Sequence, residues 1–233
     1  MSESLSPGFF GKIPSRGDFL SRRLPSSVAT AWENWLQALT TGVRAAGKRG
    51  WQDAWLTAPL WHFVLGRNLA GPHGAAGVLV ASADRVGRLF PFTVIGAAAL
   101  ESSASAADWA RQAEGLAVAA LDDAFDPVHL DEALNALGPP LAPQGPNRAA
   151  GVWPLVLDGD WPEPGDPLAE DEAAQPGPGP DQSEWWCRGS DRVGPVRLRC
   201  YGLPGTQTAT AMVLGGAEVQ PRDGYSAPYS GAK

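Results

Sequence analysis

Three short apolar segments of the sequence place the strongest limit on the fold. They span residues 60–65, 76–81 and 90–96, and each is apolar at successive positions rather than at alternate ones. This pattern is typical of a strand whose two faces are both buried. Because short turn-forming stretches connect the segments, we expect three antiparallel neighbours in one sheet that is covered on both sides.

Helical patterns lie before and after these predicted strands. From Pro25 onward, apolar residues including Trp32, Trp35 and Val43 recur at helical spacing, until Gly47 ends the pattern. Further helices are expected at residues 51–57, 105–124 and 128–137. We therefore predict an α/β protein with a single domain, in which helices flank a mixed β-sheet in a three-layer α/β/α arrangement.

A proline-rich segment interrupts the regular pattern. Half of the 22 prolines fall within residues 138–183, where long helices or strands cannot form. The later part of this segment is expected to be a mobile acidic loop, and residues 152–157 are a possible strand inside it. After the segment, we expect three more strands at residues 183–187, 196–201 and 206–214.

These patterns predict one domain over residues 1–233. Its N-terminal core spans residues 8–137, the Pro/Gly-rich insert spans 138–183, and strands within 184–220 complete the sheet. The residues after the insert are too few to build an independent core, which favours their joining the first part of the chain.

Charge and composition exclude several classes of protein. The net charge of −7 and the pI near 4.9 argue against a nucleic-acid binder, which needs a surplus of basic residues. No apolar run is long enough to span a membrane, and no signal peptide is evident, so we expect a cytoplasmic protein. Cys187 and Cys200 are the two cysteines, and we expect buried free thiols, with a disulfide as the alternative.

Familiar catalytic motifs are missing from the sequence. It contains no phosphate-binding loop, no nucleophile elbow, and no His or Cys spacing typical of a zinc site. We therefore predict no catalytic residue, no metal and no cofactor.

Two loops carry charged residues that no helix or strand period explains. The first reads Ser-Arg-Gly-Asp at residues 15–18, and the second reads Asp-Arg-Val-Gly-Arg at residues 84–88. In one interpretation, the arginines present planar guanidinium groups to acidic or phosphorylated groups of a partner. In the other, the aspartates pair with arginines inside the protein and lock the loops. The candidate partner-binding residues are Ser15, Arg16, Asp18, Asp84, Arg85 and Arg88.

Adjacent tryptophans at Trp185 and Trp186 add one further candidate. Neighbouring residues of a strand point to opposite faces, so we expect one tryptophan in the core and the other near the surface. An exposed tryptophan is typical of protein interfaces, and we include Trp185 among the partner-binding residues.

Several segments together resemble the TagF/ImpM family of type VI secretion-associated proteins. They are GFFGKIPSRGDF at residues 8–19, the Trp32 and Trp35 pair, residues 58–63, and SADRVGRLFP at residues 82–91. The similarity is strong over residues 8 to about 100 and weaker toward the C-terminus. The long insert at 138–183 departs from a compact member of this family.

This resemblance implies a bacterial, cytoplasmic accessory protein without catalytic activity. It implies a role in repressing the secretion apparatus after translation, through binding to regulatory proteins that include a forkhead-associated scaffold. Two alternatives stay open at this point: a hydrolase that uses the carboxylates of Asp18 and Asp84, and a structural adaptor of the secretion apparatus.

Overall fold

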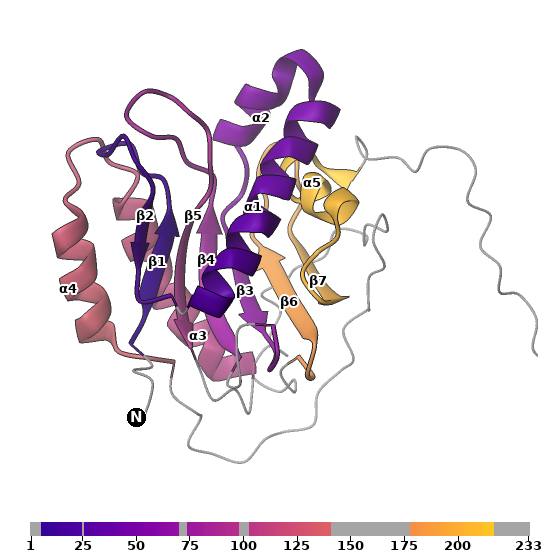
Figure 1. Ribbon diagram of the computed structural model, residues 1–233. Coiled ribbons are helices and arrows are strands. Elements are labelled where there is room, and N and C mark those ends of the chain that lie inside the picture. The colour runs from indigo at the N-terminus through magenta and orange to yellow at the C-terminus, as the bar shows by residue number, and fades with distance from the viewer. Residues whose placement is uncertain (1–5, 25, 70–73, 98–102, 141–177, 217–233) are drawn as a thin grey trace, which may run out of the picture.

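Seven strands form one sheet at the centre of the molecule (Figure 1). The computed structural model describes residues 6–24, 26–69, 74–97, 103–140 and 178–216. The order across the sheet is β2-β1-β5-β4-β3-β6-β7, and every neighbouring pair is antiparallel. The strands are β1 (Gly8–Gly11), β2 (Leu20–Arg22), β3 (Trp61–Leu65), β4 (Ala75–Val80), β5 (Phe92–Ala97), β6 (Gln182–Cys187) and β7 (Val196–Tyr201).

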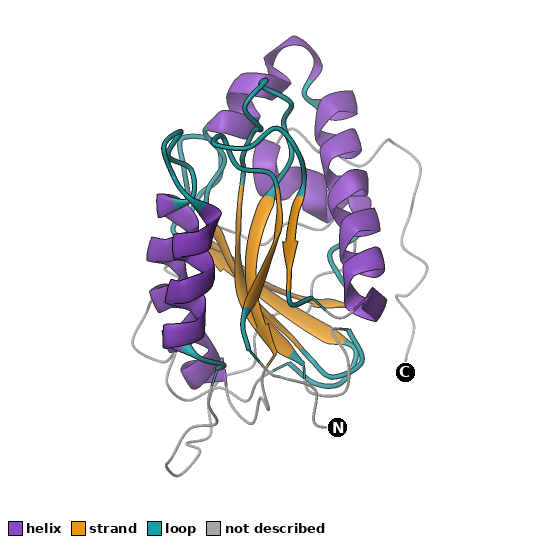
Figure 2. Ribbon diagram, turned by 60° about the vertical axis from the view of Figure 1, so that its left-hand side comes forward, coloured by secondary structure: helices purple, strands orange, loops and turns teal. Residues whose placement is uncertain are grey.

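Helices cover both faces of this sheet, as Figure 2 shows from the side. One face carries α1 (Ser26–Ala46), α2 (Trp51–Leu56) and α5 (Thr206–Leu214), and a short 3-10 helix, η1 (Lys48–Gly50), joins α1 to α2. The other face carries α3 (Ser103–Ala119) and α4 (Pro127–Leu137). The predicted three-layer α/β class is confirmed, and the sheet is antiparallel rather than mixed in direction.

The three apolar segments form the middle of the sheet, in agreement with the sequence-based expectation. They correspond to β3, β4 and β5, which pair in sequence order as antiparallel neighbours. All five residues of β3 and all six of β4 are buried, because helices pack on each side. The apolar stripe of α1 packs on one face, where the Trp32 ring centroid lies 5.1 Å from that of Phe63.

The strands after the insert extend the same sheet beyond β3. Strand β6 pairs with β3, and β7 pairs with β6. Residues 141–177, which include the possible strand at 152–157, lie outside the described residues. Cys187 and Cys200 are buried free thiols, as expected. Their strand partners are Val196 and Ser183 respectively, so the register keeps the two cysteines at opposite ends of the hairpin.

The predicted strand at residues 206–214 is wrong, because these residues form helix α5. Every residue from Thr208 to Leu214 is buried, so the helix has no polar face along most of its length. A run of this kind has no helical period in its polarity, and its threonines and valine favour a strand by propensity. Close packing against α1 decides the outcome: a Cβ on Gly42 would lie 2.5 Å from the Thr210 hydroxyl oxygen.

The expected surface tryptophan is also absent, since Trp185 and Trp186 are both buried. They do point to opposite faces of β6, with Trp185 in the core beneath α1 and Trp186 in the core beneath α3. The expectation was wrong because it took one face of β6 to be open. Trp186 instead lies between His62 and Arg197 of the neighbouring strands, at 5.3 Å and 5.0 Å from its ring centroid.

Candidate functional site

Three connections meet at one end of the molecule, above the ends of β1, β4 and β5 (Figure 1). They are the β1–β2 loop (residues 12–19), the β4–β5 loop (residues 81–91) and the α3–α4 loop (residues 120–126). The backbone N–H of Arg85 donates to the carbonyl of Arg16 over 2.9 Å, which ties the first loop to the second. Arg16 Nη2 lies 3.2 Å from Asp126 Oδ1, and this ion pair connects the first loop to the α3–α4 loop.

Asp84 is the centre of this assembly. Its side chain is fully buried, and both carboxylate oxygens accept hydrogen bonds. Oδ2 accepts from Lys12 Nζ at 2.9 Å and from Arg88 Nε at 2.6 Å. Oδ1 accepts from the backbone N–H groups of Val86 at 3.1 Å and Arg88 at 2.9 Å. The predicted internal pairing of Asp84 with an arginine is therefore present, and a lysine joins it.

This environment keeps the Asp84 carboxylate ionised. Burial acts to raise the pKa of Asp84, because it removes the charge from water. The hydrogen bonds from Lys12, Arg88 and Val86 act in the opposite direction and outweigh burial, so the pKa lies well below its usual range. A carboxylate held in this way is a fixed negative charge at neutral pH.

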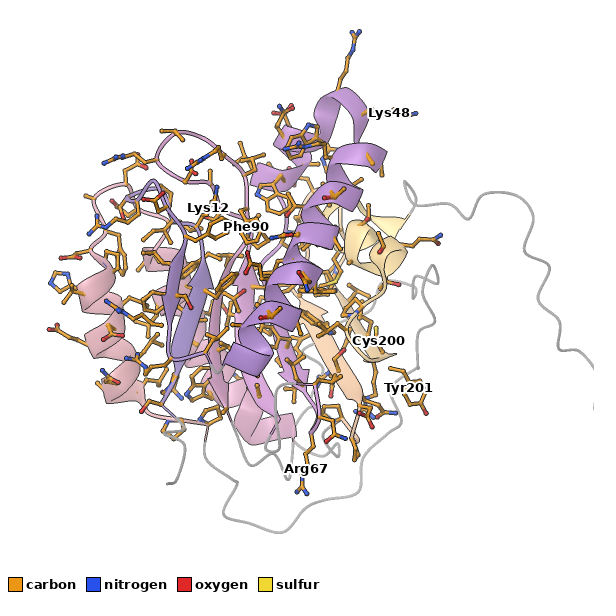
Figure 3. All side chains as sticks on the ribbon, in the orientation of Figure 1. Lys12, Lys48, Arg67, Phe90, Cys200 and Tyr201 are labelled. Atoms are coloured by element: carbon orange, nitrogen blue, oxygen red, sulfur yellow. The ribbon has the colours of Figure 1, made fainter. Side chains whose placement is uncertain are left out.

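Lys12 is a member of the site that sequence reasoning missed. Its ammonium group lies 4.8 Å from the ring centroid of Phe19, and the Phe19 ring lies edge-on to Phe90 at 4.8 Å. Figure 3 shows Lys12 and Phe90 at the loop end of the molecule. One feature of the sequence could have predicted this role: Lys12 lies between a glycine and an isoleucine at the end of an apolar run. A charged side chain at such a position needs a buried partner.

Two of the three arginines at this site are held by the protein itself. Arg88 reaches both loops, because its Nε contacts Asp84 and its Nη2 donates to the carbonyl of Gly17. Arg16 contacts Asp126 and also donates from Nη1 to the carbonyl of Ser15 over 3.1 Å. Both side chains still expose part of their surface, 60% for Arg88 and 46% for Arg16.

Arg85 and Asp18 differ from these residues, because both are exposed and their side chains have no hydrogen-bond or ionic partner among the described residues. A Cβ placed on Gly17 would lie 3.8 Å from Arg85 Nη2, so the guanidinium group lies beside the first loop. Ser15, by contrast, is buried and its hydroxyl has no partner within the described part of the chain. The structure thus gathers all the loop candidates at one end, while Trp185 lies inside the core.

We call the exposed part of this assembly the arginine loop surface. Two exposed apolar side chains belong to it, Phe19 at 46% and Val86 at 68%. It consists of Arg16, Asp18, Phe19, Arg85, Val86 and Arg88.

The Asp84 carboxylate is inaccessible from solvent. Its side chain has no exposed surface and accepts four hydrogen bonds from the protein itself, whereas Asp18 is exposed. Within the described ranges, no group of three or more His, Cys, Asp or Glu side chains could hold a metal ion.

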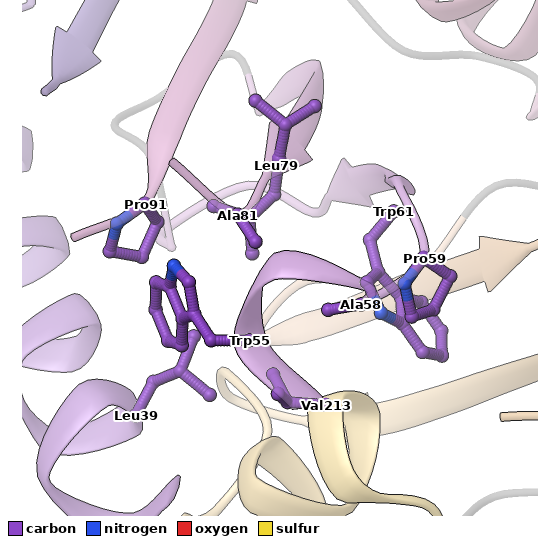
Figure 4. A pocket seen from close by; sticks show the side chains of 10 residues that line it. Leu39, Trp55, Ala58, Pro59, Trp61, Leu79, Ala81, Pro91 and Val213 are labelled. Atoms are coloured by element: carbon purple, nitrogen blue, oxygen red, sulfur yellow. The ribbon is translucent and has the colours of Figure 1, made fainter. Parts of the chain in front are cut away.

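A small apolar cavity lies elsewhere, between α1, α2, α5 and the sheet (Figure 4). Its volume of about 20 Å³ is far below that of a small-molecule site, and its lining includes Trp55, Trp61 and Val213. It contains no acidic or basic side chain. A cavity of this size has room for about one water molecule.

Comparisons with known proteins agree with the sequence motifs. The family described as "TagF N-terminal domain, Type VI secretion system-associated" matches residues 8–137. The crystal structure of PA0076 from Pseudomonas aeruginosa PAO1 is similar to this fold, with a TM-score of 0.67 and 29% identity over 98% of this chain and 100% of that one. No curated protein is significantly similar. Among the described residues, none of the helices has the length and hydrophobicity that a transmembrane helix needs.

Proposed function

Because the chain belongs to the TagF family of type VI secretion system-associated proteins, we propose that it regulates this secretion system by binding another protein. In this proposal it is a non-catalytic, cytoplasmic accessory protein that represses the apparatus after translation. The arginine loop surface makes the contact. The forkhead-associated scaffold of the secretion system, which the family resemblance implies, is the first candidate partner.

One observation carries the proposal: the site uses its buried charges to fix the shape of two loops. The Asp84 carboxylate accepts hydrogen bonds from Lys12 and from the Nε of Arg88, so these groups already have partners within the protein. The groups left at the surface are the exposed edges of the guanidinium groups, the Asp18 carboxylate, and the exposed side chains of Phe19 and Val86. Rigid loops that present arginine beside apolar groups are typical of protein interfaces, where arginine and aromatic residues are enriched.

Affinity capture tests the proposal with two matched variants. The tagged native chain, an Arg16→Gln/Arg85→Gln variant and a Lys48→Gln/Arg67→Gln control are expressed in a bacterium with an active type VI system. Both variants lose two exposed positive charges, but Lys48 and Arg67 lie away from the arginine loop surface (Figure 3). We expect the native chain and the control to capture a component of the secretion system, and the surface variant to lose it.

Capture, together with an activity assay of the purified chain, separates the alternatives. Capture of no secretion component by the native chain would contradict a regulatory role through binding. Turnover of phosphoesters or carboxylic esters by the purified chain, lost in Asp18→Asn, would favour the hydrolase. Co-purification with assembled secretion particles in a fixed ratio would favour the structural adaptor.

A further inference from the structure

We infer that Arg85 binds a side-chain carboxylate in an acidic segment of the partner protein, and that Val86 contacts an apolar side chain next to that carboxylate. This inference rests on the proposed function and adds the chemistry of the partner. Three features of the arginine loop surface support it: the free guanidinium group, the fixed backbone beneath it, and the local balance of charge.

The guanidinium group of Arg85 is the first feature. Arg16 and Arg88 already donate to Asp126, Asp84 and Gly17, whereas the Arg85 side chain has no such partner among the described residues. A guanidinium group presents two parallel N–H donors that fit a carboxylate. Arg85 therefore keeps both donors available at the surface.

The backbone that carries Arg85 is the second feature. The N–H of Arg85 donates to the carbonyl of Arg16, and the N–H of Val86 donates to Asp84 Oδ1. Gly87 closes the turn at a φ of 81° by donating its N–H to the carbonyl of Asp84 over 2.8 Å. Since this turn is fixed before the partner arrives, binding does not have to order it.

The local charge is the third feature, and it favours a carboxylate over a phosphate group. Lys12 and Arg88 share the charge of Asp84, and Arg16 is paired with Asp126. Two cations on one anion leave a net positive charge, and Arg85 and Asp18 add one charge of each sign, so these residues together carry a surplus of one positive charge. This surplus matches the single charge of a carboxylate. Phosphate groups are bound by several unpaired arginines, whereas among the described residues Arg85 is the one arginine of this surface without an internal partner.

The exposed side chain of Val86 indicates which kind of residue lies next to the carboxylate in the partner. Its side chain is 68% exposed at the tip of the same turn, next to Arg85. An apolar side chain of the partner that covers Val86 would also exclude water from the Arg85–carboxylate contact and strengthen it. The partner segment thus has an Asp or Glu adjacent to an apolar residue.

A carbodiimide experiment tests the nature of the partner group. A carbodiimide joins an amine directly to a carboxylate, and the chain has just three lysines, Lys12, Lys48 and Lys233. The full-length Arg85→Lys variant is mixed with the secretion component that the native chain captures, and treated with carbodiimide. We expect a peptide that joins position 85 to an Asp or Glu of that component. An Arg67→Lys control should give no corresponding product.

Affinity measurements complete the test. Arg85→Gln should bind the captured component at least about tenfold more weakly than the native chain, and Arg67→Gln within about twofold of it. Equal affinity for Arg85→Gln, or a complex with Arg85→Lys that gives no product at position 85, would overturn the inference. Loss of binding after phosphatase treatment of the component would also overturn it. Failure of the native chain to capture any component would instead contradict the proposed function.

Discussion

Lys12 and Asp84 form a buried ion pair, and its contribution to the stability of the protein depends on both partners being present. Lys12 exposes 8% of its side chain and Asp84 exposes none. Desolvation of two such groups offsets much of their mutual attraction, but removal of one leaves the other charged without a counter-ion. Arg88 shares the carboxylate from the solvent side, where its own charge remains hydrated.

Asp84→Asn should therefore destabilise the protein. An asparagine can still accept from the backbone of Val86 and Arg88, yet it leaves the Lys12 ammonium group buried and unpaired. We expect the free energy of unfolding to fall by about 3 kcal/mol, measured by urea denaturation. Asp18→Asn is the matched control, and this exposed substitution should change stability by less than about 0.5 kcal/mol. Equal effects of the two substitutions would contradict the structural role of Asp84.

The stabilisation by Asp84 should depend on pH. Because its folded-state pKa is depressed, its contribution is fully present above the unfolded pKa of about 4 and is lost as pH falls further. The stability difference between the native chain and Asp84→Asn should be constant from pH 7 to pH 5. Below about pH 4 it should shrink by about 1 kcal/mol per pH unit. Urea denaturation across this range measures it, and a difference unchanged at pH 3 would contradict the assignment.

Part of this site could be predicted from the sequence. The pairing of Asp84 with a nearby arginine could be expected, since Arg88 is four positions away in the same loop. The role of Lys12 could not, because 72 positions separate it from Asp84 and the register of the sheet brings them together. The exposure of Trp185 was misjudged for a related reason, since burial depends on what covers each face of β6.

At the scale of elements, the geometry of the arginine loop surface depends on how closely strand β1 approaches strand β5. Gly11 ends β1 at a φ of 131°, and a Cβ there would lie 2.1 Å from the carbonyl oxygen of Pro91. The next residue, Lys12, donates its backbone N–H to the same carbonyl over 3.3 Å. A side chain at position 11 would push the two strands apart and displace the Lys12 ammonium group from Asp84.

Gly11→Ala should therefore lower the stability of the protein far more than the same substitution of a glycine in the β4–β5 loop. Gly87 also has a positive φ, of 81°, but a Cβ there would meet no atom within 4 Å. Gly87→Ala should lower stability by about 1 kcal/mol through backbone strain, and Gly11→Ala by more than about 3 kcal/mol. Thermal and urea denaturation compare the two. Similar losses would show that the close approach to Pro91 does not matter.

The elements differ in how far the sequence predicts them. Strands β3, β4 and β5 are predictable, because a short apolar run between turns is typical of a strand covered on both faces. Helix α1 is predictable from its apolar stripe. Helix α5 was not, since its buried length lacks a polar face and its packing against Gly42 is a long-range contact that no local pattern contains.

At the scale of the whole molecule, helices occupy both faces of the sheet and leave one loop end to carry the charged motif. The two motif segments at residues 8–19 and 82–91 are far apart in sequence, yet they meet through the β1–β5 pairing. Family membership could be expected from these segments, whereas their convergence on Asp84 required the structure. We propose that this end of the molecule regulates secretion by contact with a partner.

Secretion by living cells tests that claim most directly. The chain is overproduced in a bacterium with an active type VI system, and the protein that the system releases into the medium is quantified. We expect the native chain and the Lys48→Gln/Arg67→Gln control to reduce release several-fold. The Arg16→Gln/Arg85→Gln variant, present at equal level and stability, should leave release unchanged. Equal reduction by all three chains would contradict the proposal.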